Sequence, residues 1–125
     1  KMDNKSEVDF LSLLLPQGVL DYFTLLHFTQ MDKEICLYLD EKNIIPEEYS
    51  KDKLLSKGFF DEITVQDFPL RGKAVFLHIR RRRWLNLTTG QTVFRDWDMV
   101  AKGTRMTKEF ASFLKVISRY PSGKQ

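Results

Sequence analysis

The stretch from Lys73 to Arg83 constrains the fold most strongly, because its side chains alternate with a period of two residues. One face receives Val75, Leu77 and Ile79, and the other receives Ala74, Phe76, His78, Arg80 and Arg82. This period is typical of a half-buried β-strand. We therefore expect one strand over the whole range, and its arginine end must meet solvent or a ligand.

Hairpins are expected on both sides of this strand. Turn-forming residues and alternating apolar runs mark them. The first hairpin pairs Thr24–Gln30 with Glu34–Glu41, and the second joins the central strand to Gln91–Trp97 through a loop at Asn86–Gly90. Three further segments read as a polar loop with at most a short helix (Asn43–Gly58), a β-rich run (Phe59–Gln66) and a turn (Asp67–Gly72).

Helical spacing appears near both ends of the chain. An N-terminal helix over residues 7–15 is ended by Pro16 and Gly18. A C-terminal helix over residues 105–119 has Thr104 or Thr107 as its N-cap and a stripe formed by Phe110, Phe113, Leu114 and Ile117. The chain is thus predicted to be an α+β protein. It has a small antiparallel sheet of hairpins (residues 24–97) between two helices, in one domain (1–125).

The size and cysteine content exclude several classes of protein. A chain of 125 residues suits one core and makes a multistep enzyme unexpected. The single cysteine, Cys36, permits neither an intramolecular disulfide nor a four-cysteine metal site. No stretch approaches the roughly 20 apolar residues of a membrane span. We expect a cytoplasmic protein without membrane contact.

Charge is segregated along the chain. Residues 1–70 hold seven Lys and Arg against fourteen Asp and Glu, whereas residues 71–105 hold nine basic residues against two acidic ones. Residues 106–125 add four basic residues and one acidic residue. Such segregation is typical of a protein with one anion-binding surface.

The run Arg80-Arg81-Arg82-Arg83-Trp84 is the first candidate site. Four neighbouring guanidiniums repel one another, a polyanion relieves that repulsion, and Trp84 offers a ring for stacking. In the alternative interpretation the arginines pair with the acidic first half and Trp84 closes the core. The candidate nucleic-acid contacts are Arg71, Lys73, Arg80, Arg81, Arg82, Arg83, Trp84, Arg95, Lys102 and Arg105.

The other motifs in the sequence are weaker indications of a functional site. Gly103–Thr107 either binds a phosphate at the helix start or, more simply, caps the helix. His78 and His27 have no clustered partners, and the carboxylate pairs Glu47-Glu48 and Asp61-Glu62 lie in polar segments without a nucleophile. We therefore expect no catalytic residues, no metal and no cofactor.

The order of residues also resembles a known family. The stretch Ile63-Thr64-Val65-Gln66-Asp67-Phe68-Pro69-Leu70-Arg71-Gly72, the strand that follows it, Phe94, and Gly103–Thr107 are similar to the N-terminal region of insertion-sequence transposases of the zinc-ribbon-bearing DDE type. The likeness covers roughly Leu14 to Arg119 and is greatest to members that encode this region apart from the catalytic one. It implies a zinc-ribbon-like sheet that has lost its zinc, since Ile45–Tyr49 and Trp84–Gly90 contain no cysteine.

Three functions follow from these patterns. The first is noncatalytic binding of double-stranded DNA, which the resemblance implies to be the terminal inverted repeats, in the service of a separate transposase catalytic subunit. The second is a protein-interaction module that docks onto that subunit, or onto a second copy in a homodimer, without touching DNA. The third is RNA binding with Trp84 and Phe76 as stacking platforms.

Overall fold

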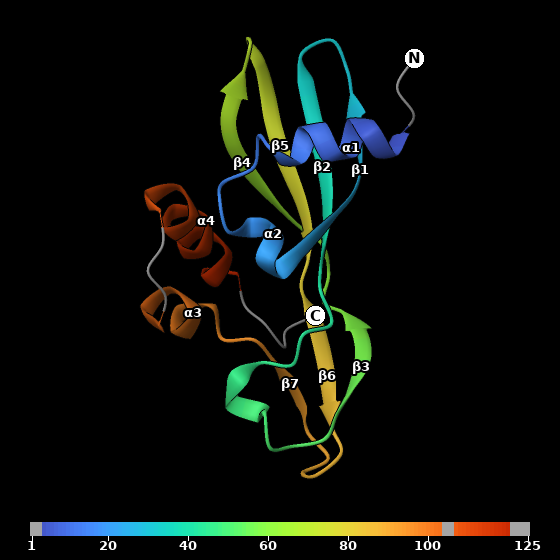
Figure 1. Cartoon of the computed structure of the whole chain (residues 1–125), viewed down its shortest axis with the longest axis vertical. Coiled ribbons are helices and arrows are strands. Elements are labelled where there is room, and N and C mark those ends of the chain that lie inside the picture. The colour runs from blue at the N-terminus through green and yellow to red at the C-terminus, as the bar shows by residue number, and fades with distance from the viewer. Residues whose placement is uncertain (1–3, 104–106, 121–125) are drawn as a thin grey trace.

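The computed structural model describes residues 4–103 and 107–120 and contains two β-sheets joined end to end (Figure 1). Sheet A has the strand order β1-β2-β5-β4, and sheet B has the order β3-β6-β7. In chain order the elements are α1 (Asn4–Ser12), α2 (Val19–Tyr22), β1 (Phe23–Gln30), β2 (Glu34–Glu41), a 3-10 turn (Glu47–Tyr49), β3 (Leu54–Phe59), β4 (Ile63–Leu70), β5 (Lys73–Arg80), β6 (Arg82–Asn86), β7 (Thr92–Phe94), α3 (Trp97–Gly103) and α4 (Lys108–Ser118). The expected α+β class is confirmed.

Sheet A consists of two antiparallel hairpins joined by a parallel pair. β1 pairs with β2 and β4 pairs with β5 in antiparallel fashion, as the hairpin patterns predict. β2 and β5 run parallel, however, from the pair Glu34–Ala74 to the pair Asp40–Arg80. The expectation of a purely antiparallel sheet is wrong at this pairing. The long connection between β2 and β5 carries the chain back to the same end of the sheet, as a parallel pair requires.

Helices cover one face of sheet A and form the core with it (Figure 1). The expected stripe of α4 is buried, and its members are Phe110, Phe113, Leu114 and Ile117. Thr107 Oγ1 accepts a hydrogen bond from the Phe110 N–H at 3.2 Å, so Thr107 is the N-cap. Trp97 at the start of α3 stacks on Phe23 with ring centroids 5.3 Å apart. The amphipathic helix thus docks as its periodicity predicts.

Sheet B is built around Trp84, which is fully buried. Its indole Nε1–H donates to Asn43 Oδ1 at 2.8 Å. Of the two segments in which the resemblance implies lost cysteines, the one at 84–90 is bonded to residues just beyond 45–49. Asn86 Nδ2 donates to Asp52 Oδ2 at 2.8 Å, and the Leu87 N–H donates to the carbonyl of Lys53 at 2.8 Å. Hydrogen bonds therefore hold the β6–β7 turn against the loop that leads into β3.

Several element bounds differ from the expectation. The N-terminal helix lies at residues 4–12 rather than 7–15, β3 lies inside the expected loop 43–58, and α3 follows β7 where no helix was expected. β4 continues to Leu70, so the turn is confined to Arg71 and Gly72, both with positive φ (53° and 79°). The expected strand over residues 73–83 is divided at Arg81. No helix in the described ranges is long and apolar enough to cross a membrane.

Candidate nucleic-acid interface

The four consecutive arginines lie where the chain passes from sheet A to sheet B. β5 ends at Arg80 and β6 begins at Arg82, so Arg81 stands between the sheets. The guanidinium of Arg80 donates to both carboxylate oxygens of Asp40, at 2.7 and 2.5 Å. This bond to Asp40 raises the pKa of Arg80. The planar fork of Arg80 is thus occupied by a carboxylate of the same chain.

Two phenylalanines at the end of β3 and just beyond it explain how a strand accommodates four guanidiniums. The guanidinium carbons of Arg80 and Arg82 lie 4.2 and 4.6 Å from the ring centroid of Phe59. Those of the other two arginines lie 5.7 and 5.8 Å from the ring centroid of Phe60. Strand alternation therefore sends two cations to each ring, within the range of a favourable cation–π contact.

Oxygen atoms of the chain hold the remaining arginines of the run. Arg81 is buried and donates to the carbonyl of Tyr120 at 3.1 Å, and burial lowers the pKa of this guanidinium. Arg82 donates to the Glu41 carbonyl and to the Ser56 hydroxyl, and Arg83 donates to the Lys57 carbonyl. The run is therefore a joint between the two sheets.

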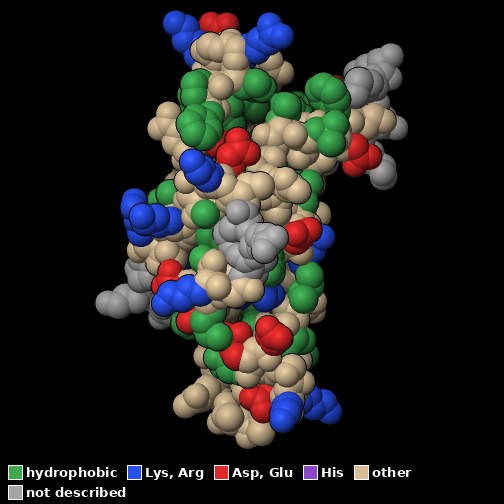
Figure 2. Space-filling model, turned by 60° about the vertical axis from the view of Figure 1, so that its left-hand side comes forward, with side chains coloured by type: hydrophobic (Ala, Val, Ile, Leu, Met, Phe, Trp, Pro, Cys, Tyr) green, Lys and Arg blue, Asp and Glu red, His purple; other side chains and the backbone are tan. Residues whose placement is uncertain are grey.

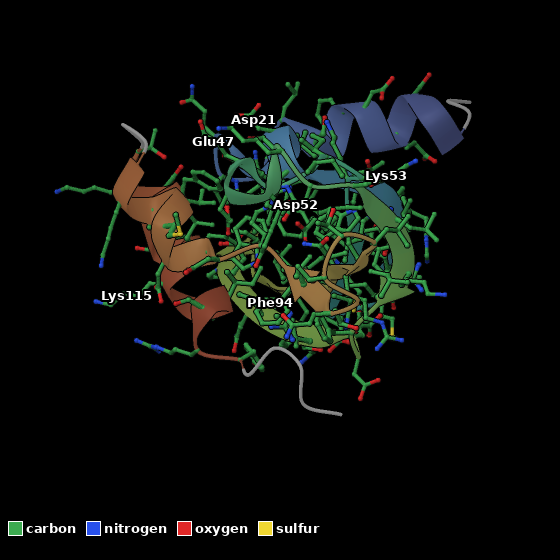
Figure 3. All side chains as sticks on the ribbon, turned by 90° about the horizontal axis from the view of Figure 1, so that it is seen from below. Asp21, Glu47, Asp52, Lys53, Phe94 and Lys115 are labelled. Carbon is green, nitrogen blue, oxygen red and sulfur yellow. The ribbon has the colours of Figure 1, made fainter. Side chains whose placement is uncertain are left out.

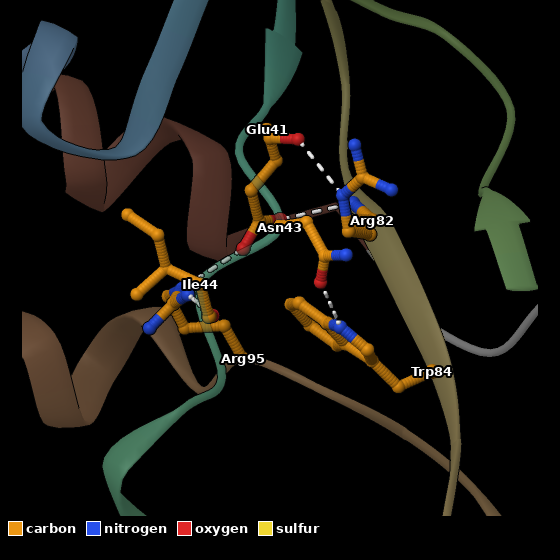
Figure 4. Close-up of polar contacts among 6 residues, drawn as sticks. All are labelled: Glu41, Asn43, Ile44, Arg82, Trp84 and Arg95. Atoms are coloured by element: carbon orange, nitrogen blue, oxygen red, sulfur yellow. Dashed lines mark hydrogen bonds and ion pairs between the residues drawn. The ribbon is translucent and has the colours of Figure 1, made fainter. Parts of the chain in front are cut away.

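Arg95 forms the centre of this joint with Glu41, and both side chains are buried (Figure 4). Arg95 Nε donates to Glu41 Oε2 at 2.8 Å, and Glu41 Oε1 accepts the backbone N–H of Arg82 at 2.9 Å. Burial raises the pKa of Glu41, although the bonds from Arg95 and Arg82 oppose that shift. Three rings surround the Arg95 guanidinium, with centroids 5.1 to 5.9 Å away: Tyr22, Trp97 and Trp84.

These positions correct the expectation that the ten predicted contacts share one surface. Side chains that are 4%, 0% and 7% exposed face the interior: Arg81, Trp84 and Arg95. The burial of Trp84 also removes one of the two stacking platforms expected for RNA binding, whereas the other, Phe76 in β5, is half-buried. Of the others, Arg71 and Lys73 lie at the β4–β5 turn, Lys102 lies in α3, and Arg105 lies outside the described residues.

Helix α4 carries a separate line of cations that faces solvent. Lys108, Lys115 and Arg119 lie at i, i+7 and i+11, which is one face of a helix, and all three are exposed. Only small exposed residues, Ala111 and Ser112, lie between them. Lys115 points outward from α4 (Figure 3), and Lys and Arg side chains gather left of the middle in Figure 2. We call Lys108, Lys115 and Arg119 the α4 cationic face.

The three charged groups of this face have no bond within the described part of the chain. The ion pairs found there join other residues, namely Arg80 with Asp40 and Arg95 with Glu41, and His78 lies 3.3 Å from Glu62. Helix stability explains only part of the pattern. Lys115 and Arg119 lie at the negative end of the helix dipole, but Lys108 lies in the first turn, where a cation is unfavourable by about 0.3–1 kcal/mol.

Sequence reasoning missed this face because consecutive arginines are more conspicuous than cations spaced by helical turns. Lys115 and Arg119 lie near the C-terminal end of the helix, where the helix dipole alone is enough to explain a cation. The signal is nevertheless present in the sequence. On a helical projection the three cations lie opposite the stripe that begins at Phe110.

The candidate residues His78 and Cys36 lie in strands of sheet A. His78 Nδ1 lies 3.2 Å from Thr64 Oγ1 and 3.3 Å from Glu62 Oε2, and its ring stacks on Tyr38 at 4.7 Å. Cys36 is buried, and burial raises the pKa of its thiol. Across residues 4–103 and 107–120, no group of three or more His, Cys, Asp or Glu side chains is arranged to hold a metal.

In comparisons with known proteins, no family model, no curated protein and no solved structure matches the chain.

Proposed function

We propose that this chain is the noncatalytic DNA-binding module of a split insertion-sequence transposase, and that it meets the duplex with the α4 cationic face. The observation that carries the proposal is the line formed by Lys108, Lys115 and Arg119, three exposed cations without partners in the described part of the chain. The resemblance to transposase N-terminal regions points to the ends of the element as the target.

The shape of this face suits a duplex. The major groove of B-DNA admits one α-helix, and α4 is an exposed helix whose outer face has only small side chains between its cations. From Lys108 to Arg119 the line extends about 16 Å at 1.5 Å per residue. A fourth exposed cation, Lys102, belongs to helix α3, which packs against α4. Contacts of this kind are made mainly with phosphates.

A salt titration of DNA affinity tests the proposal. The whole chain is titrated onto a fluorescent mixed-sequence duplex at several KCl concentrations, and binding is followed by anisotropy. If four cations neutralise phosphates, the slope of log K against log salt is about −3.6, so affinity falls roughly 100-fold between about 50 and 200 mM salt. The triple variant Lys108→Ala, Lys115→Ala, Arg119→Ala should reduce the slope by about three.

A charge-matched control separates this face from net charge. The variant Lys33→Ala, Lys51→Ala, Lys57→Ala removes three exposed cations on other elements and should keep the wild-type slope. Alanine favours helix, so the changes in α4 should not unfold it. Affinity that does not depend on salt, or equal losses in the two triple variants, contradicts the proposal.

A further inference from the structure

An apolar groove opens on the helix-covered face of sheet A, between α1, β4 and α4. It encloses about 550 Å³. Its walls include Leu11 and Leu14 from the α1 side, Phe68 from β4, and Phe113 and Val116 from α4. We call this hollow the α1–α4 groove. Hydrophobic side chains are visible on the upper part of this side and on the projecting α1 (Figure 2).

Exposed apolar side chains also lie at the rim of the α1–α4 groove and beyond it. Phe68 is 77% exposed and Leu14 is 46% exposed at its rim, and Leu13 and Phe10 are exposed nearby at the α1 end. A small ligand inside the hollow would leave these side chains in water. An elongated partner that lies across the hollow covers them, which is the usual reason for a contiguous exposed apolar patch.

The occupant that fits this site is a helix rather than a strand. β4 is an edge strand of sheet A, but Pro69 lacks an N–H and the β4–β5 register shifts between Asp67 and Leu70. Both features oppose the addition of a strand there. α1 and α4 lie on the same face of the sheet with the groove between them (Figure 1). A helix in the groove therefore completes the helical layer on the sheet.

The charges that line the groove specify the occupant further. Asp67 and Glu109 are its only charged lining residues among those described, and both are acidic. Glu109 is exposed on α4, and Asp67 keeps one carboxylate oxygen beyond the one that accepts the Phe68 N–H. Complementary charge guides partner choice at such rims. An occupant with Lys or Arg beside its apolar side chains matches this site.

We infer that the α1–α4 groove docks a basic amphipathic helix of a partner polypeptide. Its apolar side chains, spaced at i, i+3, i+4 and i+7, enter the hollow, and its cations lie beside Asp67 and Glu109. This site goes beyond DNA binding and uses none of the α4 cationic face. It gives the protein-interaction alternative a definite location.

Model peptides test the inference on the whole chain. A labelled helical peptide of about 14 residues, built from Leu and Lys with Leu at the helical spacing, is compared by anisotropy with the same peptide carrying Glu in place of Lys. We expect the Lys peptide to bind about fivefold more tightly or better. The substitutions Asp67→Asn and Glu109→Gln should reduce the difference in affinity between the Lys peptide and the Glu peptide. The asparagine side chain retains an oxygen that can accept the Phe68 N–H.

Substitutions at exposed positions locate the site without threatening the fold. Phe68→Glu and Leu14→Glu should each weaken Lys-peptide binding at least tenfold. The matched control Leu87→Glu, at a 50% exposed leucine in the sheet B turn, should not weaken it. Equal loss in the control, or equal affinity for the two peptides, overturns the inference. Sedimentation of a dimer that Phe68→Glu dissociates also overturns it, because the occupant is then a second copy.

Discussion

The buried pair of Glu41 and Arg95 should be the most sensitive point of the joint between the sheets. We expect Arg95→Met to leave the Glu41 carboxylate, 1% exposed, with the Arg82 N–H as its remaining charge-stabilising bond. Methionine has a similar length and makes favourable contacts with the rings that now surround the guanidinium, so packing changes little. The variant therefore removes the charge partner of Glu41, together with the donor to the Ile44 carbonyl.

The expected loss of unfolding free energy in Arg95→Met follows from the ion pair that the variant removes. Two unit charges about 4 Å apart interact by about 4 kcal/mol at an effective dielectric constant of about 20. Removal of one partner of a buried pair costs about 3–5 kcal/mol. Since a domain has only about 5–15 kcal/mol of stability, Arg95→Met should remove a large part of it. In urea, where m is about 1–3 kcal/mol/M, the midpoint should fall by at least about 1 M.

The loss of stability in Arg95→Met should depend on pH, and the direction of that dependence follows from the pKa of Glu41. Burial raises the pKa of Glu41, and loss of the Arg95 bond removes an opposing effect, so the pKa rises further in the variant. An acid with a raised pKa binds more protons in the folded chain than in the unfolded chain, so its contribution to stability falls as pH rises from the ordinary value through the raised one. The defect of Arg95→Met should therefore shrink between about pH 7 and about pH 5.

The double variant Arg95→Met, Glu41→Gln is the control, because it removes both charges. It should recover most of the lost stability at about pH 7 and should lose the pH dependence of the single variant. Urea unfolding followed by tryptophan fluorescence measures all three proteins. A loss below about 1 kcal/mol in Arg95→Met, or a loss that stays constant on acidification, would refute the reasoning.

Three further predictions concern single positions. Gly18→Ala should cost about 1–3 kcal/mol more than Gly90→Ala in urea unfolding. Both glycines have positive φ, but only at Gly18 would the new Cβ lie 2.7 Å from a ring carbon, whereas Gly90 faces open space. Trp84→Phe should destabilise the chain by about 1–3 kcal/mol through the lost bond to Asn43 and lost volume. Cys36, buried and with a raised pKa, should react with a thiol reagent far more slowly in the folded chain than in urea.

Local patterns predicted those parts of the fold that local physics determines. The first hairpin follows from alternation and a polar turn, and it forms over Phe23–Gln30 and Glu34–Glu41. The last helix follows from apolar spacing, with Thr107 as its cap. In both cases the residues that define the element also supply its contacts.

Pairing between strands that are distant in the sequence determines the remaining parts of the fold. The parallel contact of β2 with β5 joins strands that no short window relates. β3 contains Gly58 and several polar residues, and its pairing with β6 rather than its own propensity makes it a strand. For such segments the sequence pattern allowed a loop as readily as a strand.

The arginine run shows the same limit for a functional site. A count of charges could not reveal that Asp40 and Glu41, about forty residues earlier in the chain, would supply oxygens to Arg80 and Arg82. Nor could it reveal that the ring of Phe59 would contact the guanidiniums of both Arg80 and Arg82. Partners distant in sequence therefore convert an apparent binding surface into an internal joint.

Helix α4 connects the two proposed sites because it contributes a different side to each. Its outer side presents Lys115 to the proposed duplex, and the side that carries Phe113 and Val116 lines the α1–α4 groove. A basic helix docked in that groove would add its cations next to those of α4 and extend the surface available to phosphates. Partner and duplex would then favour each other's binding, and thermodynamic linkage requires the same factor in both directions. A noncatalytic module placed in this way would bring a second chain to DNA through one helix.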